Sequence, residues 1–261
     1  MSGKEQHFNF EDLLDIMAKL RGEGGCPWDK EQTHESLRQY MLEESYEVVD
    51  AINHKDDDEL KEELGDVLLQ VVFHAQIAAE QNRFTIRDVI DNVCRKMISR
   101  HTHIFGDDTA DTVAQVLDNW ERIKSDEKGF DTHTERMKAI PSILPALMRS
   151  YKVQKKAAAV GFDWDDVKDA VSKVDEELQE FKDVYLSENY GKIVEELGDL
   201  LFAIVNVARF LDIQPELALN EATEKFIRRF EYIENSAREA GKKLEDMSLK
   251  EMDALWEQAK L

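Results

Sequence analysis

Residues 62–69, which read EELGDVLL, recur 133 positions later as residues 195–202, which read EELGDLLF. Four further pairs of similar segments follow the same order along the chain at nearly the same offset: 25–29 with 161–165, 43–47 with 176–180, 96–100 with 225–229, and 120–121 with 256–257. Ordered self-similarity at a nearly constant distance indicates that a whole structural unit has been duplicated. The sequence therefore predicts two homologous domains.

The boundary between the two domains is expected in the polar, charged segment after residue 124, ahead of Pro141 and Pro145. We expect a linker at residues 125–145, between an N-terminal domain at 1–124 and a C-terminal domain at 146–261. Both domains then have a usual size for an independent folding unit.

The composition favours helices in both domains. Only 11 Gly and 4 Pro among 261 residues leave few turns, and the abundant Glu, Lys, Leu and Ala are good helix formers. No Asn-Gly or Asp-Gly hairpin signal lies between alternating apolar runs. We therefore predict an all-α protein, with helices in the first domain at about 10–21, 35–52, 57–81, 86–99 and 113–124, and the same pattern repeated from residue 144.

The charge excludes some classes of partner. A formal net charge of −22 disfavours binding to a nucleic-acid polymer, whose phosphates the protein would repel. The longest apolar runs, such as 67–73, are too short to cross a bilayer. Residues 1–10 contain no apolar stretch of the kind a secretory signal needs, so we expect none. Cys26 and Cys94 are too few for a disulfide framework. We expect no membrane partner and a cytoplasmic location.

Carboxylates recur in pairs on consecutive predicted helices. Glu44 and Glu47 share one helix face, and so do Glu63 and Asp66. Residues at equal distances from a turn face each other in an antiparallel hairpin. Glu44 with Asp66, and Glu47 with Glu63, are both centred on Lys55. Each hairpin should therefore bring four carboxylates level with one another. The equivalent set in the second domain, centred on residue 188, is Glu177, Glu180, Glu196 and Asp199.

Four carboxylates this close cannot all stay ionised without a counter-charge. Mg²⁺ is the expected ion, with Mn²⁺ as an alternative, because hard cations bind carboxylates together with substrate phosphates. Gly65 and Gly198 stand inside the same helices, where glycine costs about 1 kcal/mol relative to alanine. Their recurrence suggests that backbone, ligand or a neighbouring helix approaches closely there.

The pattern as a whole resembles the MazG family of nucleoside triphosphate pyrophosphohydrolases, and closely its tandem two-domain bacterial form. Besides the two acidic sets, the residues that carry the resemblance are GGCPWD at 24–29, RHTHIF at 100–105, GFDW at 161–164 and EKFIRRF at 224–230. The resemblance implies an all-α homodimer. It also implies Mg²⁺-dependent hydrolysis of nucleoside triphosphates, with broad base specificity, to monophosphate and pyrophosphate. The ions would polarise the phosphates and activate water, and Glu177 or Glu180 could take the water proton.

The two domains differ in the positive charge that a triphosphate would need. The second has Lys173 and Lys192 one helical turn before two of its acidic residues, whereas the first has Tyr40 and Glu59 at the equivalent positions. We therefore predict that the second domain is the main catalytic site and that the first is weak, structural or specialised. The family resemblance implies that six residues of the second domain contact the nucleotide: Lys173, Lys192, Lys225, Arg228, Arg229 and Trp256.

Three other interpretations compete with this one. The substrate could be narrower, such as dUTP, dCTP or a modified nucleotide. A non-catalytic acidic scaffold that binds basic proteins would explain the charge, but not the matched centres of the two hairpins. A di-iron carboxylate bundle needs Glu-x-x-His on each of two helices, and the only such pair is Glu31 with His34.

Overall fold

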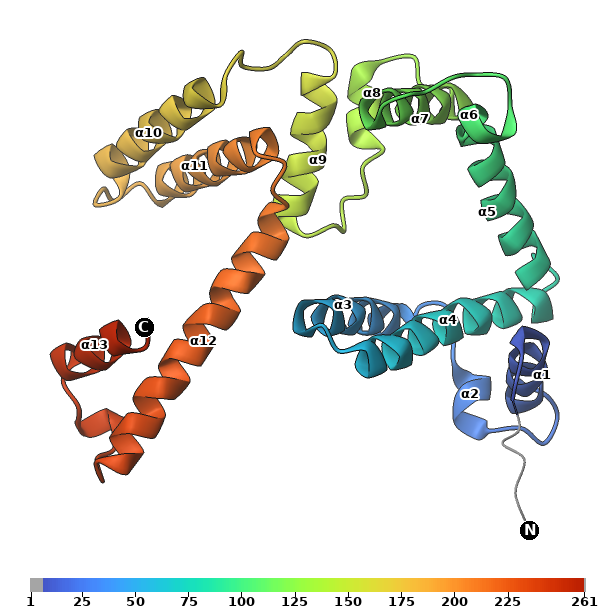
Figure 1. Ribbon diagram of the computed structural model, residues 1–261, viewed down its shortest axis with the longest axis horizontal. Helices are drawn as coiled ribbons and strands as arrows, with labels where there is room; N and C mark the ends of the chain where they lie inside the picture. The colour runs from blue at the N-terminus through green and yellow to red at the C-terminus, as the bar shows by residue number, and fades with distance from the viewer. Residues whose placement is uncertain (1–6, 261) are drawn as a thin grey trace. The chain divides into compact units, whose positions relative to one another are not determined.

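Helices account for nearly all of the regular structure, as the composition predicts. The computed structural model describes residues 7–260, except the side chains of Asp126 and Lys128, and over that range it holds helices and no strand (Figure 1). The first six residues of the expected N-terminal domain and Leu261 lie outside the described residues. Within the described part, no helix is long and apolar enough to span a membrane.

The chain divides into two compact units, residues 1–124 and 125–261. The helices of the first unit are α1 Phe10–Arg21, α2 Pro27–Glu31, α3 Arg38–His54, α4 Asp57–Glu80, α5 Ile86–Arg100, α6 Thr102–Phe105 and α7 Val113–Lys128, of which the last continues past residue 124. Those of the second are α8 His133–Lys138, α9 Ala146–Ala158, α10 Val167–Val184, α11 Tyr190–Phe210, α12 Pro215–Glu239, the 3-10 turn η1 Leu244–Asp246, and α13 Leu249–Gln258. Two homologous all-α domains are thus confirmed.

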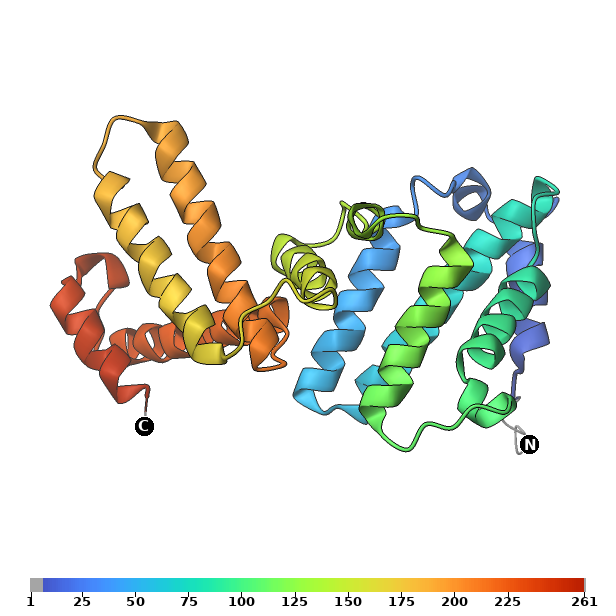
Figure 2. The same cartoon turned by 90° about the horizontal axis from the view of Figure 1, so that it is seen from above.

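Each unit is built around an antiparallel helix hairpin, α3–α4 in the first and α10–α11 in the second (Figure 2). The first hairpin turns at Lys55, which adopts the left-handed conformation with φ of 58°. Asp56 then caps α4, because its side chain accepts hydrogen bonds from the backbone N–H groups of Asp58 and Glu59. In the second hairpin, Asn189 caps α11 by accepting from the N–H of Lys192.

The main differences from the sequence prediction are in short elements. The helix expected from residue 35 begins at Arg38, and the one expected to end at 124 continues to Lys128. The short helices α2 and α6 were not predicted, and α8 lies in the segment expected as a linker. Helices this short are marginal in water and depend on tertiary packing, which periodicity does not reveal.

A hydrophobic cluster fixes α1 and the start of α3 against α4 in the first unit. Its buried members come from three different segments: Met17, Leu37, Val72, Phe73 and Ile77. Partly buried side chains of α1, including Leu13 and Leu14, pack on this cluster. The burial holds one end of the α3–α4 hairpin, whereas the acidic pairs lie toward the other end.

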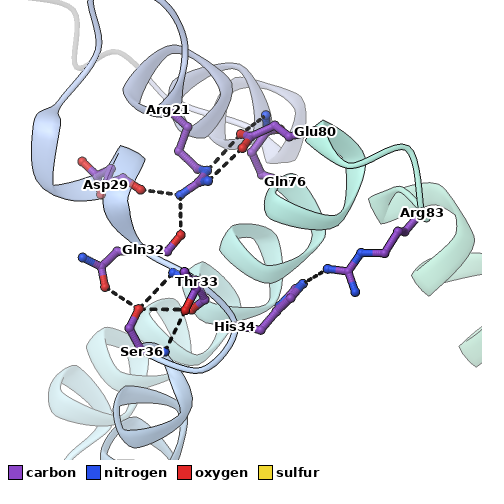
Figure 3. A network of polar contacts seen from close by, with 9 residues as sticks. All are labelled: Arg21, Asp29, Gln32, Thr33, His34, Ser36, Gln76, Glu80 and Arg83. Carbon is purple, nitrogen blue, oxygen red and sulfur yellow. Dashed lines mark hydrogen bonds and ion pairs between the residues drawn. The ribbon is translucent and has the colours of Figure 1, made fainter.

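Arg21 ties α1 to α4 and to the segment between them (Figure 3). Its guanidinium donates two hydrogen bonds to the carboxylate of Glu80, at 2.8 and 2.9 Å. It also donates to the backbone carbonyls of Asp29 and Gln32 and lies 5.4 Å from the centre of the Phe73 ring. Because only 6% of the Arg21 side chain is exposed, little water can replace these bonds.

We expect Arg21→Met to lower the free energy of unfolding by about 2 kcal/mol, because it removes the four hydrogen bonds that this buried side chain donates to Glu80, Asp29 and Gln32 and leaves Glu80 with Gln76 as its side-chain donor. Urea denaturation measures the effect. Arg95→Met is the matched control, because Arg95 pairs with Asp91 on an open surface of α5 and should cost less than about 0.5 kcal/mol. Equal losses in the two variants would contradict the role given to Arg21.

A short chain of hydrogen bonds joins Arg83 to His34 and His34 to His74. The Arg83 guanidinium can only donate, so Nε2 of His34 accepts from it. Nδ1 of His34 must then carry the proton and donate to Nδ1 of His74, 2.7 Å away. The two rings are stacked with their centres 5.0 Å apart. A proton added to Nδ1 of His74 would face the N–H of His34, and a proton added to Nε2 of His34 would face the N–H of Arg83, so either would break a hydrogen bond of this chain.

We expect acid to destabilise the first unit through this pair. Burial, and next the charge of His34, lower the pKa of His74 below the usual value for histidine, 6.5. The unfolded chain therefore binds a proton more readily, and stability is lost as the pH falls below about 6.5. His74→Phe should reduce the difference in urea midpoint between neutral and mildly acidic pH, whereas His133→Gln, at an exposed position of α8, should leave that difference unchanged. An undiminished difference in His74→Phe would refute this account.

Candidate functional site

Three carboxylates converge where α10 and α11 lie side by side. One oxygen from each of Glu177, Glu180 and Glu196 lies within 4.8 Å of the others. The side chains of Glu177 and Glu196 are 9% and 6% exposed, whereas Glu180 is exposed. Asp199, the fourth residue of the predicted set, is exposed and outside this group of three. The register of the hairpin thus places three of the four residues together.

The two buried carboxylates have a lysine one helical turn before them. Lys173 Nζ lies 2.7 Å from Glu177 Oε1, and Lys192 Nζ lies 2.6 Å from Glu196 Oε1. The hydrogen bond from Lys192 holds the pKa of Glu196 below its usual value. Desolvation, followed by the charges of Glu177 and Glu196, raises the pKa of Glu180. The group therefore combines a carboxylate whose pKa is lowered, Glu196, with one whose pKa is raised, Glu180.

One oxygen in this group has no partner. Glu196 Oε2 is buried and makes no hydrogen bond within the described structure. A buried ionised oxygen without a partner is costly, and a divalent ion shared with Glu177 and Glu180 would satisfy it. Three carboxylates are also the hard oxygen donors that Mg²⁺ and Mn²⁺ accept. The residues present therefore fit such an ion.

The first domain has a related group between α3 and α4. Oxygens of Glu44, Glu47 and Glu63 lie within 4.8 Å of one another, and Asp66 lies close enough to act on two of them electrostatically. Desolvation, and next the charge of Asp66, raise the pKa of Glu44. Desolvation, and next the charge of Glu47, raise the pKa of Glu63. Tyr40 and Glu59 stand at the lysine positions. This group therefore has more negative charge around it than its counterpart, and no lysine there to balance that charge.

Gly65 and Gly198 do not lie against any other part of the described chain. A Cβ built at either position would meet no atom within 4 Å outside the helix itself. The close approach of backbone or a neighbouring helix, which their recurrence suggested, is therefore absent within the described residues. Space remains there for a ligand or for a second copy of the chain.

The remaining predicted contacts form a separate group on α12 and α13. Arg229 lies over the ring of Trp256 at 5.4 Å, and Phe226 packs against the same ring at 5.1 Å. Lys225 and Arg228 are exposed on α12. Figure 1 shows α12 running away from the end of α11, and within the described residues no ion pair or hydrogen bond joins these side chains to the three carboxylates. Trp256 already packs on its own unit rather than standing free.

The first unit repeats this arrangement. Arg100 lies over the ring of Trp120 at 5.4 Å, and His101 contacts the same ring edge-on at 5.0 Å. The same pairing at duplicated positions shows that the arginine–tryptophan contact belongs to the architecture of the repeat.

One group was missed by the sequence reasoning. Asp50, His54 and Glu59 place potential ligand atoms within 4.8 Å of one another at the turn end of the α3–α4 hairpin. Asp50 and His54 are four residues apart on α3, a spacing that could have revealed the pair. All three side chains are largely solvated, at 53%, 63% and 42% exposed, so the contact does not form a built ligand site.

The sequence of the chain matches a known domain family. The MazG nucleotide pyrophosphohydrolase domain matches it twice, at residues 32–105 and 166–233. Each match contains one of the two helix hairpins with its acidic residues. The chain belongs to the MazG nucleotide pyrophosphohydrolase family.

Two relatives that match over nearly their full length are named as nucleoside triphosphate pyrophosphohydrolases. The chain is 48% identical over 257 residues to the nucleoside triphosphate pyrophosphohydrolase/pyrophosphatase MazG of Thermotoga maritima, covering 98% of both chains. It is 45% identical over 251 residues to the nucleoside triphosphate pyrophosphohydrolase of Escherichia coli K12, covering 95% of both. It is also 50% identical over 255 residues to the uncharacterized protein YabN of Bacillus subtilis, covering 97% of this chain and 52% of that one. The protein is an enzyme, a hydrolase of this family.

Proposed function

We propose that this enzyme hydrolyses nucleoside triphosphates to nucleoside monophosphate and pyrophosphate, with Mg²⁺ or Mn²⁺ held by the carboxylates of α10 and α11. The observation that carries the proposal is the buried carboxylate group with an unpartnered oxygen on Glu196, flanked by two lysines. The names of the relatives from Thermotoga maritima and Escherichia coli support the same reaction.

Different residues of the second domain would bind the metal ion, bind the phosphates and accept a proton. A bound divalent ion would neutralise phosphate charge and activate water. Glu177, Glu180, Glu196 and Asp199 would hold it, and the side chains of Glu177 and Glu196 are buried. Glu180, whose pKa is raised, is suited to accept the proton of the attacking water. Lys173 and Lys192 would donate to phosphate oxygens.

The group on α12 and α13 would bind the rest of the nucleotide. Lys225 and Arg228 present charge to solvent, and Arg229 and Trp256 present a paired guanidinium and indole. Stacking and charge of this kind tolerate any base, which agrees with broad base specificity. A narrower substrate, such as one pyrimidine or modified nucleotide, is the alternative.

The second domain is proposed as the main catalytic site. It alone places lysines beside buried carboxylates, because the equivalent positions in the first domain are Tyr40 and Glu59. The first domain, with Glu44, Glu47, Glu63 and Asp66, would then be a weak, structural or specialised site.

A homodimer is also proposed. Large apolar side chains are exposed at the same positions of the repeat on the outer faces of α4 and α11: Leu64 and Leu68 in the first unit, Leu197 and Leu201 in the second, each more than 40% exposed. Contiguous exposed apolar surface marks interaction sites, and a second copy would present the same surface in return. Light scattering after size-exclusion chromatography measures the mass.

We also place the enzyme in the cytoplasm. Both cysteines are free in the structure, which suits a reducing compartment.

One experiment tests the reaction directly. Purified protein is incubated with a panel of triphosphates and Mg²⁺, and chromatography separates monophosphate plus pyrophosphate from diphosphate plus orthophosphate. The proposal expects the first pair of products for several bases. The second pair would overturn the reaction, and a single accepted base would favour the narrower alternative.

A further inference from the structure

Each buried carboxylate of the second domain already has a cationic partner on its own helix. Lys173 and Glu177 are four residues apart on α10, and Lys192 and Glu196 are four apart on α11. The lysine side chains remain 35% and 46% exposed, although their partners are almost fully buried. The ammonium groups therefore lie on the solvent side of the buried carboxylates.

Each lysine also has a second, solvent-exposed glutamate within reach. Lys173 Nζ lies 2.7 Å from Glu176 Oε1, and Lys192 Nζ lies 3.5 Å from Glu195 Oε2. Both of these glutamate side chains are largely solvated, at 58% and 62% exposed. A lysine that leaves the buried carboxylate therefore keeps an exposed acidic neighbour, which holds its positive charge close to the site.

The oxygens that hold the lysines are also the oxygens that a metal ion needs. A divalent ion bound by Glu177, Glu180 and Glu196 would lie next to two ammonium groups that share its ligands. Like charges in a poorly solvated site repel strongly. The ion and the lysines therefore compete for the buried carboxylates unless an added anion takes up the lysines.

We propose that Lys173 and Lys192 are internal competitors of the metal ion, and that the phosphates of the substrate relieve the competition by binding both ammonium groups. The inference rests on the proposed function of the same site. The competition makes the binding of metal and of triphosphate cooperative in the second domain. Phosphates that bind the lysines free the carboxylates for the metal ion, and a metal ion that binds the carboxylates frees the lysines for phosphate. The first domain, with Tyr40 and Glu59 in place of the lysines, lacks this coupling.

The test measures Mn²⁺ binding to the full-length protein by electron paramagnetic resonance, without nucleotide. All variants carry Glu44→Gln and Glu63→Gln to weaken the first site, and the buffer is held near pH 8, where carboxyl groups are ionised. Adding Lys173→Met and Lys192→Met should tighten Mn²⁺ binding roughly tenfold. The charge-conserving pair Lys173→Arg and Lys192→Arg should stay close to the parent.

The control is Lys242→Met, which breaks an ion pair of 2.8 Å with Glu251 in the same unit but outside the site. It should not change Mn²⁺ affinity. The methionine pair should also weaken binding of an α,β-methylene triphosphate analogue, so that metal and nucleotide affinities move in opposite directions. A merely structural role for the lysines would weaken both.

The possible results separate the two proposals. Mn²⁺ binding that is unchanged or weaker in the methionine pair would overturn the competition and leave the metal site standing. Absence of Mn²⁺ binding in every variant, including the parent with both lysines, would overturn the metal site itself and the inference with it. Circular dichroism of each variant checks that its helical content equals that of the parent.

Discussion

Glu177→Gln is expected to lower kcat/KM for triphosphate hydrolysis by on the order of 10³-fold. The side chain is 9% exposed, and its oxygen lies within 4.8 Å of those of Glu180 and Glu196. Glutamine keeps the shape but removes the charge that holds a divalent ion. A metal ion contributes several kcal/mol to the transition state, and each 1.36 kcal/mol is a factor of ten in rate. Pyrophosphate release at saturating Mg²⁺ measures the loss.

Glu44→Gln is the matched control for this change. Glu44 has the equivalent place on α3 and belongs to the equivalent group of three carboxylates, but no lysine stands one turn before it. We expect this variant to keep more than about half of the activity. Full activity in Glu177→Gln, or equal losses in the two variants, would refute the assignment of the main site to the second domain.

Glu196→Gln is expected to lower both Mg²⁺ affinity and hydrolysis, the latter by on the order of 10²–10³-fold. Its carboxylate is the one with a buried oxygen that lacks a partner, and its other oxygen lies 2.6 Å from Lys192. Loss of the charge removes a metal ligand and leaves the lysine without its buried partner. Isothermal titration with Mg²⁺ and a rate assay measure the two effects separately.

The neighbouring residue provides a stringent control. Glu195 stands next to Glu196 in the same repeated word, yet its side chain is 62% exposed and lies 3.5 Å from Lys192. Glu195→Gln should change activity less than roughly twofold, because exposed ion pairs contribute little. If both glutamine variants lost activity alike, net charge rather than a defined ligand would be responsible.

Periodicity and repetition predicted most of the fold. The hairpins α3–α4 and α10–α11 follow from long helical patterns separated by short polar turns, and Asp56 and Asn189 cap their second helices. The short helices α2 and α6 were not predicted, because with five and four residues they are too short to show a helical period. Such elements exist through contacts made after the chain has folded.

The site was predicted to a smaller extent. Sequence spacing placed Glu177, Glu180 and Glu196 on facing helices, which the structure brings together. The burial of two of them beside the exposed third could not be read from spacing, because burial depends on how neighbouring helices cover the hairpin. The full set of four acidic ligands, with Asp199, and the roles of the cations stay predictions.

Contacts between distant segments were invisible to the sequence. Arg21 and Glu80 are 59 residues apart and meet only because α1 packs on α4. Likewise, the hydrogen bond between His34 and His74 depends on a loop folding back onto α4.

The duplicated arginine–tryptophan contacts supply the protein with an intrinsic optical reporter. An indole with a guanidinium over its face has a fluorescence that depends on that cation, and Trp256 has Arg229 in this position. If incoming phosphate draws Arg229 away, emission from Trp256 changes without any label being attached. Trp120, with Arg100 in the other half of the chain, gives the corresponding signal there, so comparing Trp256→Phe with Trp120→Phe would show which half carries the change in emission.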